Sequence, residues 1–558
     1  MDSFSQLTRQ LLKVRGITTK KDADIFLYPN YERDLHDPFL FSGMKKAVAR
    51  ILHAISNQEH IVIFGDYDCD GIPGASLLYE FFKKINYKKI SVYIPHRYTE
   101  GYGMSVKAVQ KLQKQHAALI ITVDCGITDV EPVDEANKFG IDVIITDHHL
   151  PQKNLPKAYS IINTHKKGDT YPNKNICGAG TAFKLVQALL QEGKFEVTKG
   201  WDKWLLDLAG MATIADMVAL TGENRALAYY GLKVLRKTPR VGILQLLKKK
   251  NVRAENITED DVGFTIGPHI NAASRMGEPM DAFRLLTTDD GDEAKEIVAK
   301  LLNHNADRKV EVQVIIQEVE ALMHLHADLP VIVVGNKDWK PGIVGLAANM
   351  LAEKYQKPAF VWGKHTSTHL KGSCRSDGSI NIVDLMTEVQ EVFLDFGGHE
   401  LAGGFSIHEE KIDLFAPALM AASEKLKNRY KLEGSTFSKI RLESESIEIN
   451  IDDVTWEMYK EVEQFAPFGM GNEKPVFSLK NVSVKEVRFF GKEGIHTELK
   501  LATSDVAKKT ISAIKFFTHD DFRSISIGSI VDMIVTLEKS TFTYPHELRL
   551  RIVDWKKV

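Results

Sequence analysis

The chain has 558 residues, of which 44% are hydrophobic and 26% charged, and its formal net charge is −2. This length is too great for one hydrophobic core and predicts three or four structural units of about 100 to 200 residues each. No apolar run approaches the roughly 20 residues of a membrane helix, the start lacks the layout of a secretory signal, and four scattered cysteines exclude a disulfide framework. We therefore expect a cytoplasmic protein with no membrane partner.

The amino-terminal part of the chain predicts an α/β domain at residues 46–290, preceded by a helical extension at residues 1–45. Its expected strands lie at residues 60–64, 90–95, 118–123 and 141–146, with helical patterns between them. Strands that are apolar on both faces are typical of a parallel sheet covered by helices on each side. The remainder of this domain, from about residue 220, is predicted to be mostly helical.

The second half of the chain predicts three further parts. An apolar pattern of helical period runs from about Asp292 to His326 without proline or glycine, and it predicts one long connecting helix at residues 291–328. Alternating strand and helix patterns predict a second α/β unit at residues 329–432. Five β-rich runs separated by polar or glycine-bearing turns follow at residues 433–558, and they favour a small closed barrel of the OB type.

Acidic and histidine side chains follow three strands of the first predicted sheet. They are Asp66, Asp68 and Asp70 in GDYDCDG, Asp124 in DCG, and Asp147, His148 and His149 in DHH, with Asp216 added from a helical region. Each alone is more often a helix cap or a hydrogen-bonded core residue. The carboxyl ends of parallel strands meet at one edge, however, and crowded carboxylates require a cation. We therefore predict a site for Mn²⁺ or Mg²⁺, with two ions acting in hydrolysis.

These motifs resemble those of the DHH phosphoesterases, and GGHELAGGF at residues 397–405 resembles the glycine-rich motif of their DHHA1 domain. The resemblance implies that Asp66, Asp68 and Asp124 hold one metal ion. It places the second ion among Asp70, Asp124, His148 and Asp216, so that Asp124 bridges the two. It further implies that His149 faces the scissile phosphate as a donor or acid, and that a metal-bound water is the nucleophile.

Several longer segments resemble the RecJ nucleases within this superfamily, and the resemblance runs over nearly the whole chain. They are IPHRYTEGYGM, GPHINAASRMGEP, WKPGIVGLAANML, GSCRSDGSINI and APFGMGNEKPVF. The resemblance implies an exonuclease that degrades single-stranded DNA from the 5′ end to mononucleotides in repair and recombination. It also implies work as a monomer beside a helicase and a single-strand-binding protein.

The same resemblance assigns substrate contacts. Residues implied to bind the terminal 5′-phosphate and its neighbour are Arg97, Ser373, Arg375 and Ser376. Tyr102 is implied to stack on a base, Arg275 and Arg308 to contact the strand, and His399 to contact the backbone near the metals. Guanidinium forks suit phosphate oxygens, and stacking combined with phosphate contact is typical of sequence-tolerant binding.

Four positions depart from the family pattern. His269 and Ser274 stand where the family has arginine and glycine, Lys340 where histidine is common, and Cys374 where the family has glycine. The loss of a cation at position 269 is expected to weaken contact with the strand.

Two other functions share the same metal core. One is hydrolysis of short RNA or nucleotides, because oligoribonucleases and nucleotide phosphodiesterases use the same motifs. The other is an inactive replication scaffold, against which the presence of every expected ligand argues.

Overall fold

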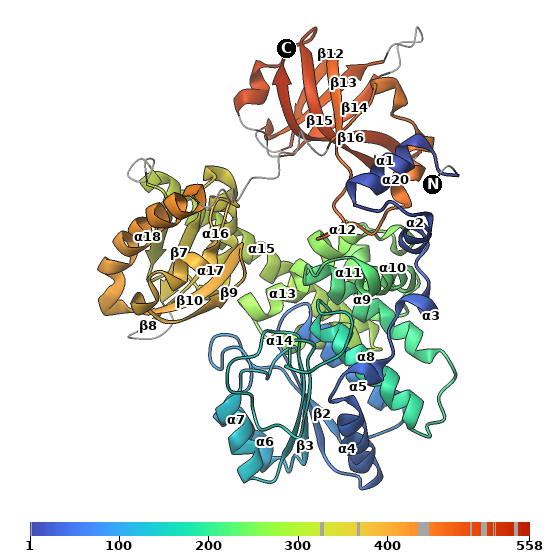
Figure 1. Ribbon diagram of the computed structural model, residues 1–558, viewed down its shortest axis with the longest axis vertical. Coiled ribbons are helices and arrows are strands. Elements are labelled where there is room, and N and C mark those ends of the chain that lie inside the picture. The colour runs from blue at the N-terminus through green and yellow to red at the C-terminus, as the bar shows by residue number, and fades with distance from the viewer. Residues whose placement is uncertain are drawn as a thin grey trace. The chain divides into compact units, whose positions relative to one another are not determined.

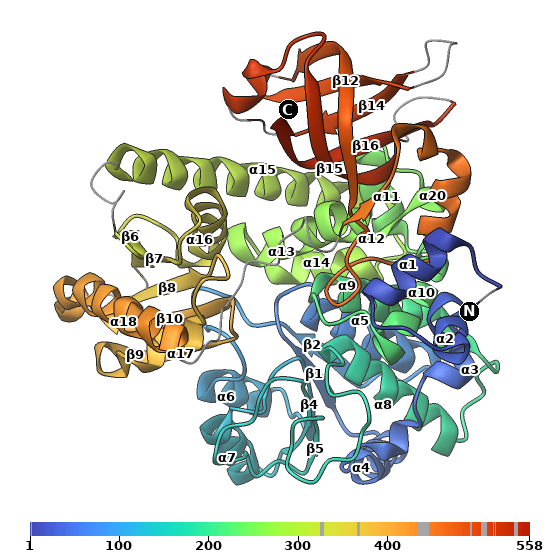
Figure 2. The same cartoon turned by 45° about the horizontal axis from the view of Figure 1, so that its top comes forward.

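The structure is a computed structural model that describes all residues except 2, 324–328, 365–368, 433–445, 492–493, 504–509, 517, 519 and 541–544. The chain forms two units (Figures 1 and 2). The larger contains His36–Asp216 and Tyr230–Lys439, and the smaller contains Met1–Leu35, Met217–Tyr229 and Ile440–Val558. None of the described helices combines the length and apolarity needed to cross a bilayer.

The larger unit begins with a five-stranded parallel sheet in the order β2-β1-β3-β4-β5. Its strands are β1 (Ile61–Gly65), β2 (Ile90–Tyr93), β3 (Leu119–Val123), β4 (Asp142–Thr146) and β5 (Ser160–Ile162). The first four confirm the predicted strands. The fifth was not predicted, because three residues are too few to show a periodic pattern.

Helices cover both faces of this sheet, which explains why every residue of β1 and β3 is buried. One side carries α6 (Val106–Lys114) and α7 (Val130–Lys138), and the other carries α4 (Met44–Ser56), α5 (Gly71–Lys84) and α8 (Gly178–Glu192) (Figure 1). The strand order reverses between β1 and β3. In sheets of this kind, ligands bind beyond the carboxyl ends of the strands at this switch point.

A helical region follows the sheet and ends in the predicted long helix. Its elements are α9 (Leu206–Ala215), α10 (Gly222–Leu235), α11 (Val241–Lys249), α12 (Glu259–Asp261), η4 (Val262–Ile266), α13 (Gly267–Met276), α14 (Pro279–Thr287) and α15 (Gly291–Leu322). Helix α15 has 32 residues and is capped at its amino-terminal end by Asp290, whose carboxylate accepts hydrogen bonds from the amides of Asp292 and Glu293. The long connecting helix is thereby confirmed, while residues 324–328 of the predicted span lie outside the described residues.

The second α/β domain contains a mixed sheet in the order β6-β7-β8-β10-β9, in which only β6 and β7 are parallel. Its strands are β6 (Ile332–Asn336), β7 (Ala359–Lys364), β8 (His369–Arg375), β9 (Phe393–Gly398) and β10 (Ala402–His408). Its helices are α16 (Pro341–Tyr355), α17 (Ile382–Thr387) and α18 (Ile412–Leu432). Phe360, Phe405 and Phe415 pack together in the core between this sheet and its helices.

The smaller unit confirms the predicted carboxyl-terminal barrel. Its strands are β11 (Ile447–Glu448), β12 (Phe477–Phe490), β13 (His496–Ala502), β14 (Thr510–Lys515), β15 (Ile530–Ser540) and β16 (Glu547–Lys557). Strand β12 pairs with both β13 and β15, and this closes the five long strands on themselves. The two-residue β11 was not predicted.

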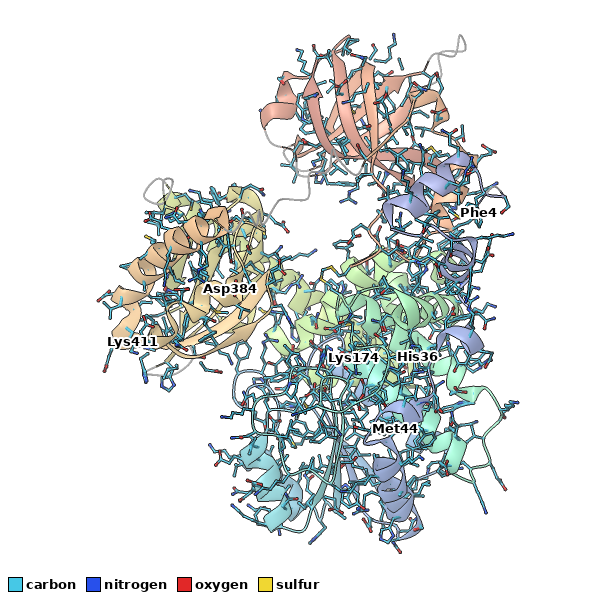
Figure 3. The ribbon with its side chains drawn as sticks, viewed as in Figure 1. Phe4, His36, Met44, Lys174, Asp384 and Lys411 are labelled. Carbon is cyan, nitrogen blue, oxygen red and sulfur yellow. The ribbon has the colours of Figure 1, made fainter. Side chains whose placement is uncertain are left out.

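The amino-terminal helices of the chain belong to the same unit as this barrel. They are α1 (Gln6–Val14), α2 (Lys20–Leu27) and α3 (Tyr31–Asp34). Helix α20 (Trp456–Glu463), between β11 and β12, belongs to this unit as well. Leu11, Leu12 and Leu27 lie in one buried cluster with the barrel core, and Phe4 packs against it (Figure 3). The side chain of Arg15 donates to Asn472 Oδ1 at 2.8 Å, which further ties the two ends of the chain together.

Candidate functional site

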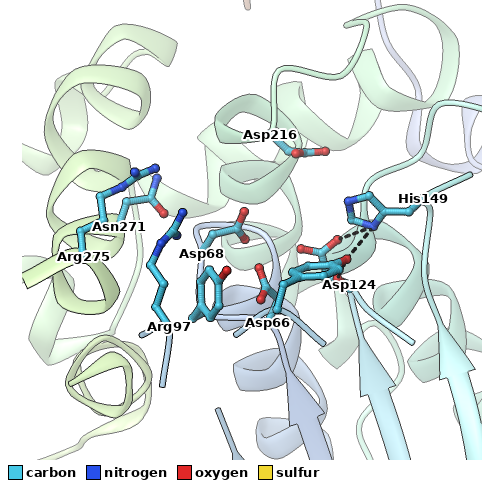
Figure 4. Close-up of a pocket in the computed structure, with 10 residues that line it drawn as sticks. Asp66, Asp68, Arg97, Asp124, His149, Asp216, Asn271 and Arg275 are labelled. Carbon is cyan, nitrogen blue, oxygen red and sulfur yellow. Dashed lines mark hydrogen bonds and ion pairs between the residues drawn. The ribbon is translucent and has the colours of Figure 1, made fainter. Parts of the chain in front are cut away.

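A pocket of about 250 Å³ opens beyond the carboxyl ends of β1, β3 and β4 (Figure 4). It is lined by Asp66, Tyr67, Asp68, Arg97, Tyr102, Asp124, His149, Asp216, Asn271 and Arg275. In Figure 4, the carboxylates and His149 lie opposite the side chains of Arg97 and Arg275. The pocket therefore has an acidic wall and a cationic wall.

Two of the three aspartates in the loop after β1 are held by backbone hydrogen bonds. Asp68 Oδ1 accepts from the amides of Asp70, at 2.8 Å, and Gly71, at 3.1 Å. The carboxylate of Asp70 accepts from the amides of Gly178, at 2.6 Å, and Ala179, at 2.7 Å. These amides begin helix α8, whose positive end favours a carboxylate. The helix thus holds Asp70 in place although its side chain is buried.

Asp124 occupies an unusual backbone conformation immediately after β3, with φ of 61°. Aspartate tolerates this left-handed region better than most residues. Tyr102 donates a hydrogen bond to the carbonyl oxygen of Asp124 at 3.0 Å. Gly178 passes so close that an added Cβ would lie 2.5 Å from the Cβ of Asp124. The position of Asp124 therefore depends on a glycine at the start of α8.

The DHH segment after β4 brings His148 into the group of carboxylates. His148 Nε2 lies 3.1 Å from Asp124 Oδ1 and 3.7 Å from both Asp70 Oδ2 and Asp216 Oδ2. Burial and the neighbouring charge of His149 lower the pKa of His148 to about 4. The ring is therefore neutral at physiological pH, which is the form that binds metals.

Asp147 orients the second histidine of this segment. Its buried carboxylate accepts from the amides of Ile127, His148 and His149 and lies 2.8 Å from His149 Nδ1. Burial opposes the charged form of His149, but the hydrogen bond with Asp147 outweighs it and raises the pKa of His149 to about 9. With Nδ1 engaged by Asp147, Nε2 is the nitrogen that remains for a substrate.

The acidic wall fits divalent cations. Three groups of described residues bring possible ligand atoms within 4.8 Å of one another: Asp66, Asp68 and Asp124; Asp70, His148 and Asp216; and Asp124, His148 and His149. Burial and mutual repulsion raise the pKa of Asp66, Asp124 and Asp216 well above the ordinary value and that of Asp70 to about 6. Asp66 Oδ1 is buried and accepts no hydrogen bond from any residue that the structure describes. A hard divalent cation would neutralise the repelling carboxylates and would coordinate Asp66 Oδ1.

The arginines of the cationic wall come from the first α/β domain, and one of them contacts the second. Arg97 lies over the ring of Tyr67, 4.7 Å from its centroid, and Arg275 donates to the carbonyl oxygen of Gly342. The Nε atoms of Arg275 and Arg308 are buried and donate to no acceptor among the described residues. Burial and the charges of Arg97 and Arg308 lower the pKa of Arg275 to about 9. The free Nε donors and the mutual repulsion of these arginines favour an anionic ligand.

Two glycines of α16 allow the predicted phosphate ligands to converge. A Cβ added at Gly342 would lie 3.4 Å from Arg97 Nε, and one added at Gly345 would lie 3.1 Å from Ser373 Oγ and 3.5 Å from Arg375 Nη2. These residues therefore lie around the first turns of one helix. Lys371 lies near this group, because burial and the nearby charge of Arg97 lower the pKa of Lys371.

The structure places the remaining predicted contacts less directly. The hydroxyl of Ser376 donates to the carbonyl oxygen of Ile380 at 2.6 Å and accepts from the amide of Gly378 at 3.0 Å, so it shapes a turn. His399 forms the turn between β9 and β10, where its amide donates to Ala402 at 2.8 Å. The hydroxyl oxygen of Tyr102 lies 3.1 Å from His149 Nδ1, beside the acidic wall.

The four departures from the family pattern lie outside the lining of the pocket. His269 is buried, donates from Nδ1 to the carbonyl oxygen of Thr265 at 2.5 Å and accepts at Nε2 from Asn305 at 3.0 Å. Ser274 is also buried, and Lys340 pairs with Glu311. Cys374 is buried against Met386, and all four cysteines are free. His269 is therefore a core residue, and the weaker strand contact expected from the missing arginine stays a prediction.

Four residues of the site were given no role by sequence reasoning. They are Tyr67, Asp147, Asn271 and Lys371. Tyr67, Asp147 and Asn271 lie inside the quoted motifs, and of these side chains only Asp147 was named, as a member of the acidic cluster. Asn271 Oδ1 accepts from the amide of Cys69 at 2.9 Å, which connects α13 to the aspartate loop. Tyr67 and Lys371 carried no signal of their own.

The fold and the two-walled pocket define a DHH-type phosphoesterase with a DHHA1 domain. Family models match in the same order: the DHH family N-terminal domain at residues 60–213, the DHHA1 domain at residues 328–425 and the RecJ OB domain at residues 446–554. The single-stranded-DNA-specific exonuclease RecJ of Dickeya dadantii is 30% identical over 493 residues, covering 85% of this chain and 84% of that relative. The chain therefore belongs to the RecJ family.

Other relatives agree. The single-stranded-DNA-specific exonuclease RecJ of Bacillus subtilis is 35% identical over 500 residues, which cover 89% of this chain but 62% of that longer relative. The crystal structure of RecJ from Thermus thermophilus in complex with Mn²⁺ matches with a TM-score of 0.79 and 26% identity, covering 99% of this chain and 76% of that one. The corresponding complex with Mg²⁺ matches with a TM-score of 0.73 and 25% identity, over 99% and 74% of the two chains.

Proposed function

We propose that the chain is a metal-dependent exonuclease that hydrolyses single-stranded DNA from the 5′ end to mononucleotides. The observation that carries the proposal is the pocket itself, in which a cluster of carboxylates lies opposite Arg97 and Arg275. Among the described residues, the buried atoms Asp66 Oδ1 and Arg275 Nε have no hydrogen-bond partner. Two divalent ions would neutralise the carboxylates of the acidic wall, and the phosphodiester would bind the arginines of the cationic wall. Family membership supports DNA as the substrate, because the relatives are named as single-stranded-DNA-specific exonucleases.

We assign the acidic wall to metal binding. Asp66, Asp68 and Asp124 would hold one Mn²⁺ or Mg²⁺ ion, and Asp70, His148 and Asp216 would hold the second with Asp124 between them. When bound, such ions activate water and stabilise negative charge on the phosphoryl group. The N-terminus of α8 orients Asp70.

His149 is assigned to the scissile phosphate. Asp147 holds Nδ1 and favours the protonated ring, so Nε2 carries a proton toward the pocket. From there it donates to a phosphoryl oxygen or to the leaving oxygen. Tyr102, hydrogen-bonded to Asp124, closes this side of the pocket and presents its ring to a base.

The cationic wall is assigned to the DNA backbone. Arg97, Ser373 and Arg375 would bind the terminal 5′-phosphate and thereby set the direction of digestion. Arg275 and Arg308 would contact the phosphates that follow. Ser376 and His399 would contribute through the turns that they shape.

We further propose that the protein acts as a cytoplasmic monomer in repair and recombination, beside a helicase and a single-strand-binding protein. These proposals rest on the family resemblance. The barrel is expected to help capture the strand, as OB-type barrels bind oligonucleotides.

The proposal is tested by digesting one single-stranded DNA, labelled separately at each end, with Mn²⁺ and with a chelator. The matching duplex and RNA are digested in parallel, and the Asp124→Ala variant serves as the inactive control. Metal-dependent loss of 5′ mononucleotides from the single strand alone is expected. Preference for short RNA would assign the protein to the oligoribonuclease branch, and no activity with any metal would favour a scaffold.

A further inference from the structure

Phe264 is the most exposed large apolar side chain of the described residues, with 81% of its surface accessible. It lies in η4 (Val262–Ile266), a turn of π-helix that leads directly into α13. Such turns are rare and are frequently found at functional sites. Val262 and Ile266, at the ends of the turn, are fully buried. The backbone is therefore anchored while the ring between them projects into solvent.

Phe264 continues a face of α13 that extends from the catalytic pocket toward the amino-terminal end of the helix. Within residues 267–275, only Pro268, Asn271 and Arg275 are not buried. Together with Phe264 they follow the spacing i, i+4, i+7 and i+11, which places all four on one helical face. Asn271 and Arg275 line the pocket (Figure 4). At about 1.5 Å per residue, Phe264 lies about 10 Å farther along this face.

Cationic side chains lie near the buried side of α13. Lys250, Arg308 and Lys309 lie close enough to the buried His269 of α13 that their charges lower its pKa. The space beside the ring is open, since a Cβ added at Gly263 would meet nothing within 4 Å. Proteins that bind single strands without reading sequence combine aromatic rings with cations that hold phosphates, and the region around α13 contains both.

We propose that Phe264 stacks on a nucleobase of the single strand, at a position 3′ of the nucleotide that occupies the catalytic pocket. The inference rests on the proposed function, because it requires the strand to leave the pocket along α13. Only an unpaired base offers its face to a ring in this way. Phe264 therefore contributes to the preference for single strands over duplex.

The test uses 5′-phosphorylated oligonucleotides that carry 2-aminopurine at successive positions, titrated in EDTA so that no cleavage occurs. We expect the fluorescence change to be largest at one position beyond the first nucleotides. In Phe264→Ala this change disappears and binding weakens roughly 5- to 150-fold, the range for loss of one stacked base. Phe264→Trp keeps both signals. Leu414→Ala, which removes a 63% exposed side chain from α18, serves as the matched control and behaves as the unaltered protein.

Two results would overturn the inference. If Phe264→Ala binds every oligonucleotide as tightly as the unaltered protein, the ring does not contact the strand. If Phe264→Leu retains the position-dependent fluorescence change, the contact is apolar docking and not stacking. Unfolding of the variants is monitored by thermal melting, and no change is expected at so exposed a position. Failure of the unaltered protein to bind any single strand would instead refute the proposed function.

Discussion

Replacement of Gly178 by alanine tests whether the start of α8 positions the acidic wall. The added Cβ would lie 2.5 Å from the Cβ and 2.8 Å from Oδ1 of Asp124, whereas ordinary contact begins at 3.4 Å. Asp124 or the helix must therefore move by about 1 Å. Because the amide of Gly178 also binds Asp70, movement of the helix disturbs the second metal group as well. A displacement of this size at a catalytic centre can reduce the rate about 100-fold.

We expect Gly178→Ala to lower kcat about 100-fold and to weaken Mn²⁺ binding, measured by calorimetry, with a loss of stability of about 1–3 kcal/mol from overpacking. Gly291→Ala is the matched control, since a Cβ added there meets nothing within 4 Å and the residue also begins a helix. It should retain activity and metal affinity. A Gly178→Ala protein with kcat and Mn²⁺ affinity within threefold of the unaltered values would refute the reasoning.

Three other predictions concern the charges of the site. Asp147→Asn removes the partner that raises the pKa of His149 to about 9, so activity should fall about 10- to 100-fold and its alkaline decline should move to lower pH in a pH–rate profile. The pKa of Asp70 is raised to about 6, so the metal-free protein gains stability as pH falls through 6. Thermal melting should therefore show a larger stabilisation by Mn²⁺ at pH 7.5 than at pH 5.5, and an equal shift would contradict this. Arg375→Ala should raise KM about tenfold or more for 5′-phosphorylated DNA and less for a 5′-hydroxyl strand, with kcat retained.

The convergence of the acidic residues could be predicted from the sequence, because it depends only on which residues directly follow the strands. Apolar runs identify parallel strands, and their carboxyl ends share one edge, so the residues after β1, β3 and β4 had to meet. The long helix was equally predictable from its unbroken period. Strands β5 and β11 were missed because two or three residues carry no period, and their pairing is decided by the neighbouring strand.

Long-range packing was beyond prediction from sequence. Nothing in the sequence of α1 shows that Leu11 and Leu12 share a core with the barrel more than 400 residues away. The direction of individual side chains was also undetermined. Asp147 was read only as part of a motif, yet it holds His149, and the hydroxyl of Ser376 shapes a turn.

By itself, the sequence determined which residue types follow which strands and the family to which the chain belongs, and from these it predicted a metal-dependent phosphoesterase. Tertiary structure alone decided which of these side chains face the pocket and which are buried in a core. His269 and Asn271 illustrate the difference, since they are two residues apart on α13 and only Asn271 lines the pocket. The reason is physical. Local pattern follows from backbone periodicity, whereas the environment of a side chain depends on elements that pack against it from elsewhere in the chain.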